Sequence, residues 1–172
     1  KTTLLKIIFG LIIIKKGDIL YNNISKNNVN IKEWRNNIHY LEQHPKLFNR
    51  KTIENIYYGN CMSNLCNMKE INIIIEKYNL EKVISKINKT IHAGKRGTNL
   101  SGGQRQFISL LRICANPKKI ILLDEPTSSM DPSLRESVYK LIIHLKKQNC
   151  IILVISHDTN FQRIKDRSIT LK

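Results

Sequence analysis

The stretch Leu100-Ser101-Gly102-Gly103-Gln104, read together with Ile120–Asp131 (IILLDEPTSSMD), decides the fold of this chain. The two glycines of the first stretch allow a backbone to approach an anion closely. In the second stretch, four apolar residues predict a strand that is buried on both faces, and a pair of acids ends it. Together they predict a phosphate-handling site at which a metal ion and a water could sit.

The bulk composition describes one soluble globular domain with a strong positive charge. A chain of 172 residues with 41% hydrophobic and 24% charged residues is long enough to build a real core. The net charge of +16 would suit nucleic acid, acidic lipid or an anionic ligand. The lysines are spread along the chain, however, and aromatic residues make up only 6%, which is few for a base-stacking surface. We therefore expect no specific nucleic-acid partner.

The cysteines and the apolar runs indicate neither a metal site nor a membrane span. Cys61 and Cys66 lack the C-x-x-C spacing of a metal pair, whereas Cys114 and Cys150 stand in apolar contexts that favour core positions. Without a signal peptide, the expected compartment is reducing. The longest apolar run, Ile7–Ile14, is far shorter than the roughly 20 residues that a membrane helix needs, so we expect a buried helix end and its exit.

The order of the expected elements predicts an α/β fold. Ser101 with Gln104 forms a capping box, and Asp131 followed by Pro132 begins another helix. Strands that alternate with helices imply a parallel sheet with helices on both faces, into which the mostly helical residues 51–114 look inserted. Helices are expected over residues 2–10, 30–34, 52–58, 68–78, 80–87, 105–115 and 132–147, with a short one capped by Thr159 or Asn160. Strands are expected over residues 19–21, 38–41, 120–123, 150–155 and 168–171, the fourth of them buried.

Polar side chains follow three of the expected strands at their carboxyl ends. Asp124 and Glu125 follow one buried strand, His157 follows another, and Gln43 follows a third. In an open parallel sheet, ligands bind outside the carboxyl ends of the strands. One such residue alone would be an ordinary turn residue, but several at equivalent positions indicate a site.

A family resemblance connects these segments. Lys1-Thr2-Thr3 matches the end of the phosphate-loop pattern G-x-x-x-x-G-K-[ST] without its glycines and carries little weight alone. With the other motifs, however, the chain resembles the nucleotide-binding domain of ATP-binding-cassette (ABC) ATPases over nearly its whole length. The matching segments are Lys1-Thr2-Thr3 for the end of Walker A, Gln43 for the Q-loop, Leu100–Gln104 for the signature motif, Ile120–Thr127 for Walker B, Asp131 for the D-loop and His157 for the switch histidine.

The resemblance implies that these residues bind and hydrolyse ATP with Mg²⁺. Glu125 would be the general base, with His157 and Gln43 as the other catalytic residues. Thr2, Gln43 and Asp124 would hold Mg²⁺. The implied nucleotide contacts within the chain are Lys1, Thr2, Thr3, Gln43, Asp124, Asp131 and His157. Ser101, Gly102, Gly103 and Gln104 would contact the nucleotide of a second ABC ATPase domain in a head-to-tail dimer, homomeric or heteromeric, and Asp131 would carry a signal between the two sites.

The resemblance also implies the domain organisation. Residues 1–50 and 115–172 would form a P-loop NTPase (RecA-like) parallel-sheet core, and residues 51–114 an inserted α-helical subdomain that carries the signature motif. The glycine-rich phosphate loop and most of the N-terminal β-subdomain, including the aromatic residue that stacks on adenine, are absent from the sequence. Lys95 stands where exporters usually have an acid.

The implied function is ATP hydrolysis that drives transport. The segment Gln43–Phe48 followed by Thr52–Ile56 is similar to the exporter branch of the family, which implies export, a transmembrane domain in the same or another polypeptide, and a position on the cytoplasmic side of a membrane. One alternative is a soluble ABC ATPase that acts on ribosomes or DNA, which the charge of +16 favours. Another is a purely structural piece that binds ATP weakly because it lacks the phosphate loop.

Overall fold

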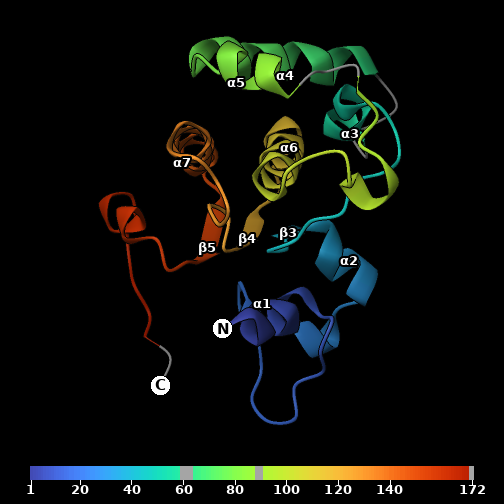
Figure 1. The fold of residues 1–172 in the computed structure, drawn as a ribbon. Helices are drawn as coiled ribbons and strands as arrows, with labels where there is room; N and C mark the ends of the chain where they lie inside the picture. The colour runs from blue at the N-terminus through green and yellow to red at the C-terminus, as the bar shows by residue number, and fades with distance from the viewer. Residues whose placement is uncertain (59–63, 88–90, 171–172) are drawn as a thin grey trace.

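The computed structural model describes residues 1–58, 64–87 and 91–170, with the backbone alone for residues 64–68. A parallel sheet lies between helices, and a further helical layer covers one side (Figure 1), which confirms the predicted α/β class. The elements in chain order are α1 (Thr2–Phe9), β1 (Leu20–Tyr21), β2 (Ile24–Ser25), η1 (Lys26–Asn28), α2 (Ile31–Asn36), β3 (Ile38–Leu41), α3 (Thr52–Tyr57), α4 (Asn64–Lys77), α5 (Glu81–Lys86), η2 (Lys95–Gly97), α6 (Gly102–Ala115), β4 (Ile120–Asp124), α7 (Pro132–Lys147), β5 (Ile151–Ile155) and η3 (Thr159–Arg163).

The sheet has the strand order β3-β4-β5, and its middle strand is buried on both faces. The strands are parallel, with Ile38 paired to Ile120 at the start of the register. Successive side chains of a strand point to opposite faces. Accordingly, Ile121 and Leu123 join the large cluster beneath α6 and α7, whereas Ile120 and Leu122 join a smaller cluster with α1 and α2 (Figure 1). The candidate site residues at the end of β4 are therefore held by the most buried strand of the sheet.

The first helix ends where the sequence predicts, but the apolar run that follows is not buried. α1 ends at Gly10, which has a φ of 85° in the left-handed region that glycine adopts easily. Beyond it, Leu11 and Ile13 are 53% and 89% exposed, so the exit from the helix lies at the surface. The reason is that the chain leaves the sheet face after Gly10 and runs outward to the β1–β2 hairpin (Figure 1).

Asparagine residues shape two of the connecting segments. Asn22 and Asn23 both have positive φ, at 50° and 63°, which closes the β1–β2 hairpin in two residues. Asn30 caps α2 because its side-chain oxygen accepts a hydrogen bond from the backbone N–H of Lys32 at 2.8 Å.

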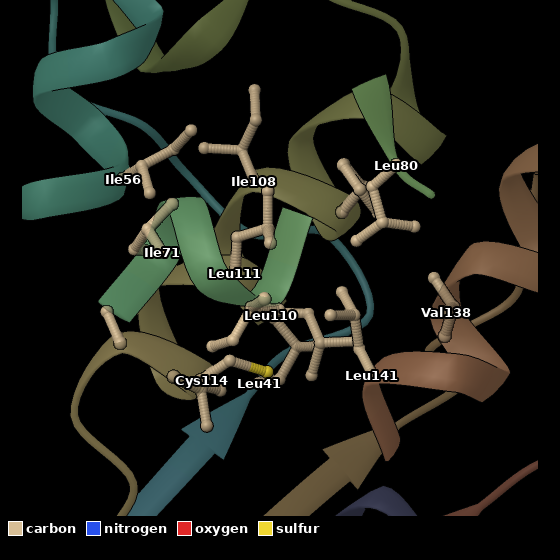
Figure 2. Packing of buried hydrophobic residues seen from close by; sticks show 14 of the residues in the cluster. Leu41, Ile56, Ile71, Leu80, Ile108, Leu110, Leu111, Cys114, Val138 and Leu141 are labelled. Atoms are coloured by element: carbon tan, nitrogen blue, oxygen red, sulfur yellow. The ribbon is translucent and has the colours of Figure 1, made fainter. Parts of the chain in front are cut away.

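The helical layer packs on the sheet through α6. Phe107, Leu110 and Leu111 of α6 are fully buried. α3, α4 and α5 cover the outer side of α6 and α7 (Figure 1), so α6 is packed between the sheet and this layer. The residues that meet in this core, labelled in Figure 2, are Leu41, Ile56, Ile71, Leu80, Ile108, Leu110, Leu111, Cys114, Val138 and Leu141.

The last part of the chain differs from expectation in three ways. Within the described residues β5 pairs with β4 alone and is partly exposed, so it is not the buried strand that its apolar sequence predicts. The N-cap of η3 is Asp158, not Thr159 or Asn160. In the strand expected over residues 168–171, the described residues 168–170 are not strand and Ile169 is 83% exposed, while residue 171 lies outside the described residues.

Cys114 and Cys150 take up the core positions that the sequence predicts for them. Cys114 is buried and Cys150 partly buried, both as free thiols. Cys61 and the side chain of Cys66 lie outside the described residues. Among the helices of the described ranges, none combines the length and the apolar character that crossing a bilayer requires.

Candidate active site

The centre of the candidate site is Asp124, the last residue of β4. Its side chain is 1% exposed, and it accepts a hydrogen bond from the Thr2 hydroxyl at the start of α1, at 3.1 Å. Tyr40 on β3 donates to the other carboxylate oxygen at 3.4 Å. Burial, followed by the nearby charge of Asp124, raises the pKa of Tyr40 to about 12, so its hydroxyl remains a donor. Three elements thus converge on one buried carboxylate.

Glu125 follows with an unusual backbone and an open side. Its φ of 50° lies in the left-handed region, which is unfavourable for a residue with a side chain. Its backbone N–H donates to the carbonyl of Ile155 at 2.8 Å, which continues the β4–β5 pairing. Its carboxylate accepts from the backbone N–H of His157 at 3.3 Å, and the His157 ring nitrogen Nε2 lies 3.7 Å from the same group. The predicted base and switch histidine therefore face each other, as two neighbouring strand ends require.

A network around Asp158 fixes the loop that carries His157. Asp158 accepts hydrogen bonds from the hydroxyls of Thr127, at 3.0 Å, and Tyr139, and it caps η3. Hydrogen bonds from Tyr139, Asn160 and Thr127 and the charge of Arg135 lower the pKa of Asp158 against the opposing effect of its burial. An open cavity of about 420 Å³ lies between this network and the Glu125–His157 pair. Glu125 and His157 line it, whereas Lys1, Thr2 and Asp124 do not.

The other residues predicted at the nucleotide are placed around α1 and β3. Lys1 is exposed at the N-cap of α1, and Thr3 is exposed in its first turn. Gln43 follows β3 with an exposed side chain, while its backbone carbonyl accepts from the Gln106 amide at 2.9 Å. The structure brings Thr2 to Asp124 and Glu125 to His157 directly, and residues 124 and 125 are neighbours in the chain. Gln43 is linked to Glu125 through Gln106, whose amide donates to the backbone carbonyls of both residues.

The signature residues begin α6 as the sequence predicts. The Ser101 hydroxyl accepts from the backbone N–H of Gln104 at 3.1 Å, and the Gln104 side chain accepts from the backbone N–H of Ser101 at 2.9 Å. Gly102 and Gly103 form the first turn, and a side chain on Gly103 would lie 3.0 Å from the backbone oxygen of Ser129. The signature motif therefore packs against the segment after β4, not against the Thr2–Asp124 pair.

Asp131 serves first as a helix cap. Its carboxylate accepts from the Ser133 hydroxyl at 2.6 Å and from the backbone N–H of Leu134 at 3.0 Å. The hydrogen bond from Ser133 lowers the pKa of Asp131, followed by that from Leu134. The carboxylate is exposed, so it can cap α7 and still face a partner.

The donor set suits a hard divalent cation that also takes ligands from phosphate. Thr2 and Asp124 offer a hydroxyl and a carboxylate oxygen 3.1 Å apart, and Mg²⁺ prefers oxygen ligands and uses few from the protein. Among the described residues there is no cluster of three or more His, Cys, Asp or Glu side chains that could hold a metal alone. The residues fit Mg²⁺ bound together with a nucleotide better than a self-contained metal centre.

The sequence reasoning missed Tyr40, Gln106 and the Asp158 network. Tyr40 reads as an ordinary strand residue, and nothing local marks its reach to Asp124. Gln106 carries a signal, because it is a polar residue on the apolar stripe that Phe107 and Leu110 define, and it is 1% exposed. A buried amide of this kind requires partners.

The fold and the site together define an ATP-binding domain of the P-loop class. They combine a parallel sheet, acids at the end of its central strand, a helix that begins with Lys1-Thr2-Thr3 and a helix that begins with the signature motif. The family model described as "ABC transporter" matches residues 1–128. The chain belongs to the ABC transporter family, whose ATP-binding domains are ATPases.

Curated relatives agree with this assignment. The chain is 34% identical, over 99% of its length, to a putative ABC transporter ATP-binding protein of Clostridium tetani, of which it covers 38%. It is 33% identical, over 99% of its length, to the energy-coupling factor transporter ATP-binding protein EcfA of Aster yellows witches'-broom phytoplasma, of which it covers 61%. It is also 32% identical, over 89% of its length, to the phosphate import ATP-binding protein PstB of Borreliella burgdorferi, of which it covers 59%.

A solved structure shares the fold. It is that of a bacterial Atm1-family ABC exporter with ATP bound, with a TM-score of 0.78 and 21% identity over 93% of this chain and 28% of the other. The chain thus spans less than two thirds of the length of these relatives, which include import proteins.

Proposed function

We propose that this chain is the ATP-hydrolysing part of an ABC exporter, in which Mg-ATP hydrolysis and closure of a domain dimer drive a substrate across a membrane. The observation that carries the proposal is the Thr2–Asp124 hydrogen bond of 3.1 Å, with Glu125 next in sequence and facing His157. Phosphoryl transfer needs positioning and charge neutralisation more than covalent chemistry, and this arrangement offers both.

The position of each site residue in the fold supports a role in binding or hydrolysing ATP. Lys1 and Thr3, at the start of α1, would hold phosphate oxygens, which a helix N-terminus also favours. Thr2, Gln43 and Asp124 would hold Mg²⁺, which when bound neutralises phosphate charge. The Glu125 carboxylate would accept the proton of the attacking water, and His157 would contact the terminal phosphate.

The start of α6 would serve a second ABC ATPase domain. Gly102 and Gly103 carry backbone N–H groups at a helix N-terminus that the capping box of Ser101 and Gln104 does not use. All four residues lie apart from this chain's own Thr2–Asp124 pair. In the full-length protein, Glu125→Gln should bind ATP without turning it over, so two domains remain associated and light scattering detects the dimer. Adding Ser101→Arg should abolish it. Persistence of the dimer in the double variant would oppose this arrangement.

The same proposal includes the domain organisation, with a core of residues 1–50 and 115–172 and a helical subdomain of residues 51–114. It also includes a transmembrane partner domain and a position on the cytoplasmic side of a membrane. Export is supported by the resemblance of the segments Gln43–Phe48 and Thr52–Ile56 to the exporter branch. In this region Phe48 stacks against Tyr58, with ring centroids 4.0 Å apart.

A flotation experiment separates transport from the alternative of an ATPase that acts on ribosomes or DNA, for which the charge of +16 is the motive. The full-length protein that carries this chain should float with membrane vesicles in a density gradient at high salt. Sedimentation with ribosomes would overturn the transport proposal.

Direct ATP hydrolysis tests the site itself. Asp124→Asn should remove Mg²⁺-dependent ATP hydrolysis, because an amide no longer supplies the buried charge. Asp166→Asn is the matched control, since Asp166 is an exposed acid paired with Lys146. Equal activity of the two variants would refute the role of Asp124.

A further inference from the structure

The amide of Gln106 lies where three functional segments meet. Gln106 is on α6, five residues after Ser101, and its side chain is buried. Its Nε2 lies 2.9 Å from the backbone oxygen of Gln43, 2.9 Å from the backbone oxygen of Glu125 and 3.1 Å from the Ser128 hydroxyl. One side chain thus touches the segment after β3 and the segment after β4 from the helix that carries the signature motif.

The orientation of this amide is fixed by its neighbours. Two of the three groups around it are backbone carbonyls, which only accept hydrogen bonds, so the nitrogen of Gln106 must face them. Its Oε1 is buried and finds no hydrogen-bond partner among the residues that the structure describes. An unpaired buried acceptor is destabilising, and an apolar side chain of the same shape would avoid it. Gln106 thus keeps one unpaired oxygen while its nitrogen donates to the backbones of Gln43 and Glu125.

The group that Gln106 holds is the strained backbone of Glu125. The left-handed φ of 50° sets the direction in which the Glu125 side chain leaves the chain. The Glu125 carbonyl accepts from Gln106 and from the backbone N–H of Ser128, at 2.9 and 3.1 Å. An unfavourable conformation of this kind persists only where its surroundings hold it, and such positions cluster at active sites.

We propose that Gln106 is a positioning residue, whose buried amide holds the backbones of Glu125 and Gln43 in the geometry for hydrolysis and links α6 to the base of the same chain. The inference rests on the proposed function, because it requires Glu125 to act as the base. It adds a connection within one chain between the signature helix and its own hydrolytic carboxylate.

The first test replaces Gln106 in the full-length protein and measures steady-state hydrolysis of Mg-ATP. Gln106→Met keeps the shape and removes the donor. We expect kcat to fall on the order of 10- to 100-fold, as for a small misplacement of a catalytic group. KM should change by less than about 3-fold. The thermal midpoint should fall, because methionine leaves the carbonyls of Gln43 and Glu125 without this donor, so kcat is compared at a temperature at which both proteins are folded. Ser109→Ala, a buried polar position of the same helix, is the control and should keep its kcat.

The second test uses pH to separate positioning from structure. Gln106→Glu places a buried carboxyl against two carbonyl oxygens, which favours its protonated form. That form donates one hydrogen bond, so the kcat of Gln106→Glu divided by that of the wild type should rise as the pH is lowered. A ratio that does not change with pH would overturn the inference, even if Gln106→Met failed to fold.

The remaining outcomes distinguish the two proposals. Equal kcat for Gln106→Met and Ser109→Ala, with Glu125→Gln inactive, would overturn the role of Gln106 alone. Unaltered turnover in Glu125→Gln would overturn the proposed function and this inference with it.

Discussion

Gly103 must lack a side chain, because the start of α6 packs directly on the segment that follows β4. A Cβ at this position would lie 3.0 Å from both the Met130 side chain and the Ser129 backbone oxygen. Since a backbone oxygen cannot move aside easily, Gly103→Ala should destabilise the protein by about 1–3 kcal/mol. Gly102 is the matched control, because its Cβ would meet nothing closer than 3.8 Å.

The measurement is the unfolding midpoint of both variants in the full-length protein. Gly102→Ala should be neutral or stabilising by up to about 1 kcal/mol, because alanine is the better helix former. Equal midpoints for the two variants would show that the packing of Gly103 does not matter.

Two tyrosines beside acids predict an alkaline loss of stability. Burial and the neighbouring Asp124 raise the pKa of Tyr40 to about 12, and burial with the hydrogen bond to Asp158 raises that of Tyr139 to about 12. Both pKa values lie above the ordinary value of 10.0, so the folded protein binds these protons more tightly. The resulting stabilisation is complete below pH 10 and is lost as the pH rises from 10 towards about 12.

Unfolding measured across this pH range, alongside the tyrosinate absorbance of the native protein, checks the prediction. Tyr40→Phe and Tyr139→Phe should each make the stability less dependent on alkaline pH. An unchanged pH dependence in both variants would contradict it.

At the scale of the elements, Asn55 joins α3 to α6 and to the loop after β3. Its side chain is completely buried, and its amide bonds the backbone N–H and C=O of Phe48 at 2.9 and 3.0 Å. Its own carbonyl accepts from Arg112 of α6 at 2.7 Å. Because truncation would leave buried backbone groups without partners, Asn55→Ala should lower the free energy of unfolding by about 3 kcal/mol.

The control for Asn55 is Asn72, an exposed residue of α4. Asn72→Ala should change the free energy of unfolding by less than about 0.5 kcal/mol, as surface substitutions usually do. Chemical denaturation of the two variants compares them. If both lose the same small amount, the bonds of Asn55 do not join these elements as described.

Local signals predicted most elements, because caps and periodicity are written in neighbouring residues. The capping box at Ser101 and the Asp131 cap appear where the sequence places them. Burial was predicted less well, because it depends on elements that are distant in the chain. β5 is apolar throughout, as β4 is up to Asp124, but within the described residues it pairs on one side only. The apolar residues Leu11–Ile13 after Gly10 are exposed.

The candidate site likewise combines features that local sequence predicts with contacts that depend on distant elements. Asp124, Glu125 and His157 follow strands, so their shared edge could be predicted from topology. The partners that hold them could not, since Tyr40 and Gln106 reach the site from other elements with no local motif to mark the contact.

At the scale of the whole molecule, the sheet and α6 divide the predicted chemistry into two halves. One half is the carboxyl edge of β4, where Asp124 and Glu125 meet Thr2 and His157. The other is the start of α6, whose glycines pack beside the segment after β4 at the N-terminus of the helix. Under the proposed function, hydrolysis requires a partner domain, and Glu125 is the base that accepts the water proton.

The most direct test of this account is ATP turnover by the full-length protein with Glu125→Gln, beside Glu136→Gln, an exposed glutamate of α7, as control. We predict that Glu125→Gln still binds ATP but turns it over on the order of 100- to 1,000-fold more slowly, because no carboxylate accepts the water proton. Glu136→Gln should match the wild type. Turnover by Glu125→Gln at the wild-type rate would contradict the account.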